Sequence, residues 1–364
     1  MTTIPSFDTP AGATAQVYVI NTDVYLAGLP VAALLSPGVG GFKRFRPLAS
    51  WSFLVQSSKG EKVLFDLSIP PDTTTYPPAI LEMFNAASAP VSIDGTKHVA
   101  DILKENGVDP ADIRSVIWSH HHFDHIGDIT TFPQSTEIVV GPGFKHEHLP
   151  AYPTRPDALL EERYFEGRAL REVNFSDPAR SSTIGAFQAY DFFGDGSFYL
   201  LHTPGHTVGH LAGLARTTSN PDTFIFMGGD VCHHGGEIRP SPHLPIPENV
   251  HFPPDSLRAR ISACPGAEQF HALNHQRGRR ADEPFFDPVL AVDIPQAMQT
   301  IKDTQLADAQ SNVFFIFAHD MEIQGIVDFF PRSANGWKEK GWREKVLWKF
   351  LADLAPAAAS NIGQ

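Results

Sequence analysis

Some segments of the chain are short runs of apolar residues, and others carry apolar residues at helical spacing. This pattern predicts both strands and helices. Short runs rich in β-branched and aromatic residues predict strands at 14–20, 50–56 and 62–67, with a hairpin turn between the last two. Two later segments, 77–87 and 98–107, carry apolar residues at helical spacing, and the second ends on a glycine suited to stop a helix. Sheet and helix are therefore both expected within the first third of the chain.

The same alternation continues towards the C-terminus. Residues 112–119 predict a buried strand, and further strands are expected in the runs 136–141, 185–193, 196–205, 210–216, 223–230 and 312–320. Helices are expected at 286–308 and 341–354. A long loop or lid is expected over 233–285 with one short helix near 254–264, and a frayed tail over 354–364. This order of elements favours layers of sheet covered by helices.

Composition and charge narrow the class of protein. The chain has 364 residues, 42% of them apolar, and a formal net charge of −13. Nucleic-acid binding is disfavoured because it normally needs a basic face, and the only basic cluster, 41–46, is short enough to predict a solvated turn. The chain has two cysteines, no signal-peptide pattern and no apolar run of about 18 residues. We therefore expect a cytoplasmic protein that contacts no membrane.

The run SHHHFDHIGD, residues 119–128, is the densest cluster of ligand-type side chains. It follows the predicted strand at 112–119. His120 and His122 are two positions apart, so on an extended segment both point to the same face. Two imidazoles that converge in this way suit Zn²⁺. Asp124 and His125 follow as the chain turns and can face a second point close by.

Three other predicted strands end in a ligand-type residue. His206 follows a tight Pro-Gly turn, Asp230 follows two glycines, and His319 ends the apolar run at 312–320. A single histidine at a strand end is usually structural or exposed, but the recurrence of such residues at four strand ends favours a shared site. Loops at strand ends are also where α/β folds usually present ligands.

These motifs, SHHHFDHIGD, TPGHTVGH, GGD and AHD in that order, resemble the metal motifs of the metallo-β-lactamase superfamily. The resemblance spans about 48–320 and implies an αββα sandwich: two mixed β-sheets flanked by helices, with metals at one edge. It implies a single domain over 1–364, with an N-terminal extension, insertions at about 141–185 and 233–310, and a C-terminal helix. The implied ligands are His120, His122 and His206 for one metal, Asp124, His125 and His319 for the second, and Asp230 as a bridge.

The resemblance further implies a dinuclear metal-dependent hydrolase, most like the N-acyl-homoserine-lactone lactonase branch. Two divalent ions, with Zn²⁺ favoured over Fe²⁺, Mn²⁺ or Co²⁺, would supply a hydroxide that attacks a carbonyl carbon. Asp124 would also carry a proton to the leaving group. Asp66 either orients a ligand histidine or caps a turn, and the sequence leaves both roles open.

The pattern departs from the lactonases at one position that bears on the substrate. They usually carry Tyr three residues after the bridging Asp, where this chain has His233, which either donates a hydrogen bond to the carbonyl group or lies in solvent, with His234 as its rival. The leading prediction is the opening of a lactone. The alternatives are a γ-lactam or cyclic carbamate, then a thioester, and last a non-catalytic zinc protein. The expected partner is a small cyclic ester or amide, and a homodimer is left open.

The other histidines are expected to have lesser roles. His121 lies between two ligands and should face away from the metals, whereas His202 and His210 should pack behind them. Exposed positions in polar loops are expected for His146, His148, His243, His251, His271 and His275.

Overall fold

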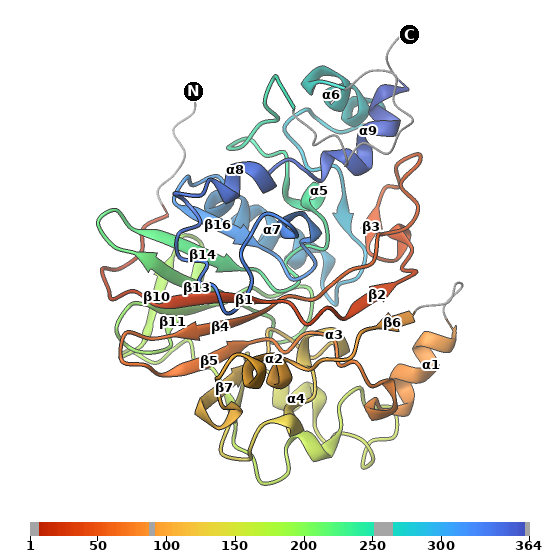
Figure 1. The fold of residues 1–364 in the computed structure, drawn as a ribbon. Helices are drawn as coiled ribbons and strands as arrows, with labels where there is room; N and C mark the ends of the chain where they lie inside the picture. The colour runs from red at the N-terminus through yellow and green to blue at the C-terminus, as the bar shows by residue number, and fades with distance from the viewer. Residues whose placement is uncertain (1–6, 87–91, 251–264, 361–364) are drawn as a thin grey trace.

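Two six-stranded sheets form the centre of the molecule, as the computed structural model of the chain shows (Figure 1). The structure describes residues 7–86, 92–250 and 265–360. The first sheet has the strand order β1-β4-β5-β7-β8-β9, with the pairs from β1 to β5 antiparallel and those from β5 to β9 parallel. Its strands are β1 (Gln16–Ile20), β4 (Ser52–Gln56), β5 (Lys62–Phe65), β7 (Ile113–Ile117), β8 (Glu137–Val140) and β9 (Leu170–Glu172).

The second sheet has the order β10-β11-β12-β13-β14-β16 and is antiparallel except for its last pair, β14 with β16. Its strands are β10 (Ser181–Ile184), β11 (Phe187–Asp191), β12 (Phe198–His202), β13 (Leu211–Thr218), β14 (Thr223–Met227) and β16 (Val313–Ile316). Two small two-stranded pairings lie outside the main sheets: β2 (Tyr25–Ala27) with β6 (Ser92–Asp94), and β3 (Leu35–Ser36) with β15 (Asp287–Pro288).

The helices vary from single turns to four turns. They are α1 (Pro78–Ala86), α2 (Val99–Glu105), α3 (Phe123–Ile126), α4 (Phe144–His148), α5 (Gly235–Ile238), α6 (Ala267–Gln276), α7 (Ile294–Asp308), α8 (Trp342–Val346) and α9 (Leu351–Ala359). Short 3-10 helices occupy Val31–Ala33, Thr73–Thr75, Pro110–Asp112, Ile129–Thr131, Glu162–Tyr164 and Met321–Ile323. None of the helices in the described ranges is long and apolar enough to cross a membrane.

The alternation of side chains along each strand explains why the two sheets stack. In β4, Phe53 and Val55 face the second sheet, whereas Leu54 faces the opposite side. In β14, Ile225 contributes to the core between the sheets and Phe226 to the outer layer. Because side chains alternate with a period of two, each strand buries one face against the other sheet and the other face under helices.

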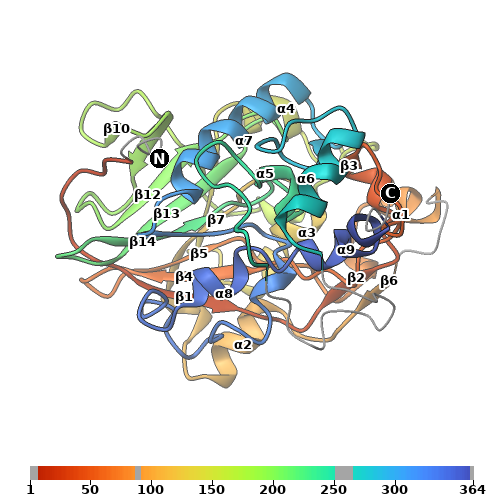
Figure 2. The ribbon, with the colours of Figure 1, turned by 90° about the horizontal axis from the view of Figure 1, so that it is seen from above.

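Helices cover the outer face of each sheet. Val99 and Leu103 of α2, with Phe144 of α4, pack on the outer face of the first sheet. Ile301 and Ala307 of α7 pack on the outer face of the second sheet. Figure 2 shows the same arrangement from above, with α2 and α7 on opposite sides of the strands. The predicted αββα sandwich is therefore confirmed.

Several predicted boundaries were wrong. The helix expected at 286–308 begins only at Ile294, because Asp293 caps its first turn. The final helix expected at 341–354 is two helices, α8 and α9. The tail is not frayed as far as Ala359, since Leu354, Ala355 and Ala358 are buried in the core. The short helix expected near 254–264 lies outside the described residues.

Two surface predictions were wrong in part or in full. The basic side chains of the cluster at 41–46, Lys43, Arg44 and Arg46, are exposed as expected for a solvated turn. Phe42 and Phe45 between them are buried, however, and Arg46 forms ion pairs with Glu322 and Asp353. His148 is buried rather than exposed, and its ring stacks on that of His121 at a centroid distance of 3.9 Å. In both cases aromatic packing, which local polarity does not reveal, decided the outcome.

A buried ion pair joins the segment after α5 to the end of α7. The Arg239 guanidinium donates to both carboxylate oxygens of Asp308, at 2.8 and 2.6 Å, and both side chains are buried. Asp308→Asn would leave a buried cation without its partner, so we expect the free energy of unfolding to fall by about 3–5 kcal/mol. Urea denaturation followed by tryptophan fluorescence measures this change. Asp303→Asn, on the same helix but half-buried, is the control, and an equal loss in both variants would contradict the prediction.

Candidate metal centre

The ends of five strands place the ligand-type residues at one edge of the sandwich. In the first sheet β5 and β7 are parallel, and Asp66 and the histidine run follow their C-terminal ends. In the second sheet β12, β14 and β16 run in the same direction, because β13 is antiparallel to both its neighbours and β16 is parallel to β14. His206, Asp230 and His319 follow these three strands. The topology therefore brings segments that are far apart in sequence to a single edge.

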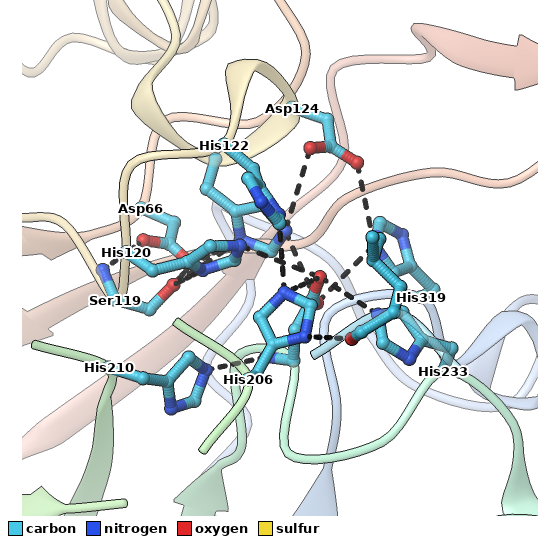
Figure 3. Close-up of polar contacts among 12 residues, drawn as sticks. Asp66, Ser119, His120, His122, Asp124, His206, His210, His233 and His319 are labelled. Atoms are coloured by element: carbon cyan, nitrogen blue, oxygen red, sulfur yellow. Dashed lines mark hydrogen bonds and ion pairs between the residues drawn. The ribbon is translucent and has the colours of Figure 1, made fainter. Parts of the chain in front are cut away.

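Two groups of donor atoms converge there (Figure 3). Within each group the potential ligand atoms lie within 4.8 Å of one another. The first group consists of His120, His122, His206 and Asp230, and the second of Asp124, His125 and His319. The structure thus brings together all seven residues that the sequence singled out as metal ligands.

The carboxylate of Asp230 lies between the two groups. Its Oδ2 atom is 3.6 Å from Nε2 of His120 and 3.5 Å from Nε2 of His206. Its Oδ1 atom is 3.2 Å from Nε2 of His125 and 3.3 Å from Nε2 of His319. One oxygen therefore faces each group, which is the geometry that a bridging carboxylate needs.

Backbone carbonyl groups fix the direction of two rings. Nδ1 of His206 lies 2.9 Å from the carbonyl oxygen of Leu290, and Nδ1 of His319 lies 2.9 Å from that of Ala49. Since a carbonyl oxygen only accepts, each Nδ1 must carry the proton, and each Nε2 keeps a free lone pair. Hydrogen bonds of this kind orient ligand histidines in metal sites.

Asp66 organises the side of the centre that belongs to the first sheet. Its carboxylate accepts hydrogen bonds from the backbone N–H of Ser119 at 2.7 Å and from the Ser119 hydroxyl at 2.8 Å. Oδ2 of Asp66 also lies 2.9 Å from Nδ1 of His125, and the Ser119 hydroxyl lies 3.0 Å from Nδ1 of His120. Both roles left open for Asp66 are therefore present. Its carboxylate accepts hydrogen bonds from the turn at Ser119, and it also contacts His125, a histidine of the second group.

His122 presents the other ring nitrogen. Its Nδ1 atom lies 3.2 Å from Nε2 of His206, so these two nitrogens point to the same place. The ring centroid of His120 is 4.5 Å from that of His122 and 4.8 Å from that of His206. Three imidazoles from two sheets thus surround one position.

His210 forms a hydrogen bond with the backbone of Asp230, as expected for a residue that packs behind the metal ligands. Its Nε2 atom accepts a hydrogen bond from the backbone N–H of Asp230 at 3.0 Å, while Nδ1 faces the hydroxyl and carbonyl oxygens of Thr203. Burial lowers the pKa of His210 to about 3, so the ring is neutral and can accept at Nε2.

Glycine is required where the loops approach other backbone. Gly127 ends α3 at φ 54°, and a side chain there would collide with Leu67. Gly205, at φ 125° just before His206, lies against the backbone of α7 at Ala297. Both loops that carry histidines therefore pack too closely for a larger residue.

Within the described part of the chain, no lysine or arginine forms an ion pair with the carboxylates of the centre. Every ion pair there that involves Asp66, Asp124 or Asp230 has a histidine as its partner. Burial lowers the pKa of His122 to about 4 and that of His206 well below its usual value, so these rings are neutral at pH 7. Burial also disfavours a charged His125, but the carboxylates of Asp230, Asp124 and Asp66 outweigh it and raise its pKa well above the usual value. The carboxylates thus attract positive charge to this point.

The donor set fits divalent metal ions. Nε2 of His120, Nε2 of His125 and Oδ1 of Asp230 are buried and make no hydrogen bond, although the last two lie 3.2 Å apart as an ion pair. Burying polar atoms without hydrogen bonds is costly, so three such atoms in the centre indicate that a ligand completes their coordination. Imidazole nitrogen and carboxylate oxygen are common ligands of Zn²⁺ and of Fe²⁺, Mn²⁺ or Co²⁺.

His233, rather than its rival His234, lies at the centre. Nε2 of His233 is 3.3 Å from Oδ2 of Asp230, and its ring centroid is 5.0 Å from that of His206. His234 instead accepts the backbone N–H of Gly236 and packs among the rings of Phe42, Phe45, Phe286 and Phe350. His233 is buried, so it is not a solvated loop residue.

A largely apolar pocket of about 320 Å³ opens onto the two groups. Phe84 of α1 and Phe123 of α3 meet edge to face in its wall, with their centroids 5.0 Å apart. Its other apolar lining residues are Leu26, Leu29, Ala33, Leu34, Leu48, Ile80, Met83, Leu159 and Leu290. Its polar lining consists of His121, His122, Asp124, Asp230, His233 and His319. No lysine or arginine lines it among the described residues.

Sequence reasoning missed the residues that act through their backbone and one buried acid. The carbonyl groups of Leu290 and Ala49 carry no sequence signal, because any residue supplies the same oxygen. Glu237, which contacts His233, could have been found from its place three residues after His234, where a capping glutamate is common.

This chain belongs to the metallo-beta-lactamase superfamily. A model of that family matches residues 45–216. Two curated relatives extend the likeness beyond this segment. The gamma-lactamase FDB1 of Fusarium pseudograminearum is 41% identical over 94% of this chain and 83% of its own length. The gamma-lactamase MBL2 of Gibberella moniliformis is 45% identical over 62% of this chain and 91% of its own. The chain is therefore a metallo-β-lactamase-type hydrolase, as predicted.

The fold is similar to that of a solved lactonase structure. A mutant of AiiA from B. thuringiensis, with N-decanoyl-L-homoserine bound at its active site, aligns with a TM-score of 0.54. The alignment covers 88% of this chain and 99% of AiiA at 17% identity. At this identity the likeness concerns the fold alone.

Asp66→Asn tests whether the contacts around His125 support a metal. The amide oxygen still accepts from Ser119, but the amide N–H₂ now faces Nδ1 of His125 and disturbs the ring's orientation. We expect metal affinity to fall by about 10–100-fold with the fold retained. Competition with a chromophoric chelator measures the affinity, and circular dichroism checks the fold. Asp72→Asn, at an exposed turn, is the control. Unchanged affinity in Asp66→Asn would rule out this role.

Proposed function

We propose that this protein opens a small cyclic amide, a γ-lactam or cyclic carbamate, at its carbonyl group with the help of two divalent metal ions. The observation that carries the proposal is the placement of two donor groups, shared by Asp230, at the inner end of an apolar pocket. The names of the two gamma-lactamase relatives, at 41% and 45% identity, favour the amide over the ester. Opening of a lactone is the second candidate, because the same attack on a carbonyl opens a cyclic ester and the fold is similar to that of AiiA.

We assign the first ion to His120, His122 and His206 and the second to Asp124, His125 and His319, with Asp230 between them. Zn²⁺ is favoured by the donor set, and Fe²⁺, Mn²⁺ and Co²⁺ are alternatives. Such ions, when bound, polarise a carbonyl group and make water a stronger nucleophile near neutral pH.

Asp124 has the position that a proton carrier needs. Its carboxylate lines the substrate pocket, 3.5 Å from Nε2 of His319 and 3.9 Å from Nε2 of His125. It can therefore face both the attacking water and the ring atom that departs. A departing amide nitrogen must gain a proton, so this role matters more for a lactam than for a lactone.

The pocket supports a neutral, apolar ring as the substrate. A volume of about 320 Å³ suits a one- or two-ring compound, and Phe84 and Phe123 offer aromatic edges and faces to it. No lysine or arginine among the described residues lines the pocket, so away from the donor groups it offers no cation for a substrate carboxylate. This disfavours β-lactam antibiotics and glutathione thioesters as substrates.

The test is hydrolysis by metal-loaded protein across a matched panel, with and without chelator: an aryl γ-lactam, an aryl cyclic carbamate, an acyl lactone, a β-lactam and a thioester. We expect chelator-sensitive opening of the γ-lactam or the carbamate. Turnover confined to the lactone would move the proposal to its second candidate. No metal-dependent turnover of any cyclic substrate would overturn it.

Asp124→Asn should fold normally and lose most of its hydrolysis. The amide cannot accept a proton, so we expect kcat to fall by about 10²–10⁴-fold. Metal content measured alongside steady-state rates separates loss of metal from loss of proton transfer. Asp128→Asn, in the same loop but in a turn cap, is the matched control. Near-normal turnover in Asp124→Asn would refute its role.

Phe84→Ala should raise KM for an aryl substrate about tenfold, with a smaller change in kcat, because it removes apolar contact but no reacting group. Glu82→Ala, exposed on the same helix, should leave both constants unchanged. Equal KM values for wild type and Phe84→Ala would show that the substrate binds elsewhere.

Two further expectations from the sequence also stay predictions: a single domain over residues 1–364, and a cytoplasmic location, supported by the low cysteine content. The sequence leaves a homodimer open.

A further inference from the structure

We propose that His121 is a specificity-determining residue whose ring forms a hydrogen bond with a hydroxyl group that the substrate carries away from its reacting carbonyl group. The inference rests on the proposed function, since it names the class of compound that the same pocket selects: a hydroxylated aromatic lactam or cyclic carbamate. It gives a role to the one histidine of the run at 119–128 that belongs to neither donor group.

His121 is a polar part of the pocket wall that the metal donor set does not use. Of the six polar residues that line the pocket, four belong to the two donor groups. The other two are His233, which lies 3.3 Å from a carboxylate oxygen of Asp230, and His121. The side chain of His121 forms no hydrogen bond or ion pair with any residue in the described ranges. It is therefore the polar group of the pocket that is most available to a bound molecule.

Packing alone does not account for an imidazole at this position. A histidine that only packs normally satisfies its ring nitrogens, as His210 does with the backbone N–H of Asp230 and the hydroxyl group of Thr203. Nδ1 of His121 is buried with no hydrogen-bond partner, so Nε2 is the nitrogen left for a ligand. Burying a polar group without a hydrogen bond is costly, and a phenylalanine would pack here without that cost. What histidine alone adds is a polar edge in the pocket wall.

Stacking on a second histidine holds this edge in place. The ring of His121 lies on that of His148 with the centroids 3.9 Å apart and 25° between the planes. His148 is buried at the end of α4, where its ring also contacts that of Phe144 at a centroid distance of 4.8 Å. A ring already packed against a buried neighbour loses little freedom when a ligand binds. His148 is therefore a positioning residue for His121.

A hydroxyl group is the partner that this ring favours. A ring nitrogen donates when it carries a hydrogen and accepts when it does not, and a hydroxyl group pairs with either form. The rest of the pocket wall outside the donor groups is largely apolar and suits the arene that carries the hydroxyl group. A hydrogen bond remote from the reacting carbonyl group is present before and in the transition state, so its loss should change KM more than kcat.

The experiment compares aryl γ-lactams and aryl cyclic carbamates in pairs that carry a hydroxyl or a methyl group at the same position of the arene. Each position of the arene is tested with the metal-loaded, full-length protein. We expect KM to be about tenfold lower for the hydroxyl compound at one position. His121→Phe keeps the ring and its stacking, so the preference should fall below twofold or reverse, with kcat changed less than threefold. An equal preference in wild type and His121→Phe at every position would overturn the proposal.

Two further variants separate the lost hydrogen bond from a disturbed loop. His121→Gln returns a polar group near the position of Nε2 and should recover part of the preference for the hydroxyl compound. His146→Phe, exposed on α4, is the matched control and should change neither kcat nor KM. Metal content is measured for every variant, because His121 lies between two of the expected ligands.

A second readout needs no turnover. Nitrogen-15 NMR of the imidazole rings in the zinc-loaded protein, with His121 assigned by comparison with His121→Phe, should show a shift of its Nε2 resonance when phenol is added. Toluene, which has a similar shape, should give a much smaller shift. Equal shifts with phenol and toluene would refute the role of His121 even if a lactam were hydrolysed. A shift specific to phenol without turnover of any cyclic substrate would refute only the proposed function.

Discussion

The carboxylate of Asp230 is the element on which the rest of the site depends. Its two oxygens face different histidine groups, so its position sets the separation between them. A buried carboxylate is costly unless positive charge surrounds it, and the chain supplies imidazoles rather than lysine or arginine at this point. His210 holds the Asp230 backbone from below through a neutral ring nitrogen. Asp230 and His210 both lie beside strands of the second sheet, so contacts within that sheet fix the position of the bridging carboxylate.

Much of the fold and of the site could be predicted from the sequence because both depend on local patterns. Strands β14 and β16 bury both faces and read as apolar runs, and each is followed by a ligand-type residue, Asp230 or His319, that their parallel arrangement brings to one edge. What could not be predicted depends on tertiary contacts. The carbonyl groups that orient His206 and His319 have no side-chain signal. His148 is buried by ring contacts with His121 and Phe144. The last helix is divided although its apolar positions continue at helical spacing.

Segments outside the two main sheets supply much of the pocket wall. Leu29, Leu34 and Leu48 come from the segment before the first long hairpin, Phe84 from α1, and Leu290 from the segment that precedes α7. The segment before α7 is also hydrogen-bonded to the loop of His206, through the N–H of Val292 and the carbonyl of Leu290. One segment thus contributes both to the shape of the pocket and to the direction of a ligand-type ring. Changes there would alter selectivity and metal affinity together.

The division of the donor atoms between two sheets has a consequence for how the chain acquires its cofactor. The histidine run lies on the first sheet, whereas His206, Asp230 and His319 belong to the second, and the N–H of Leu211 joins the two by a hydrogen bond to the carbonyl of Ser119. Contacts of such large sequence separation form late in folding, because loop closure must come first. In a nascent or partly unfolded chain the two halves of the ligand set are separate, and each half alone would bind a metal ion weakly. Tight metal binding would therefore require the two sheets to be packed as in the folded protein.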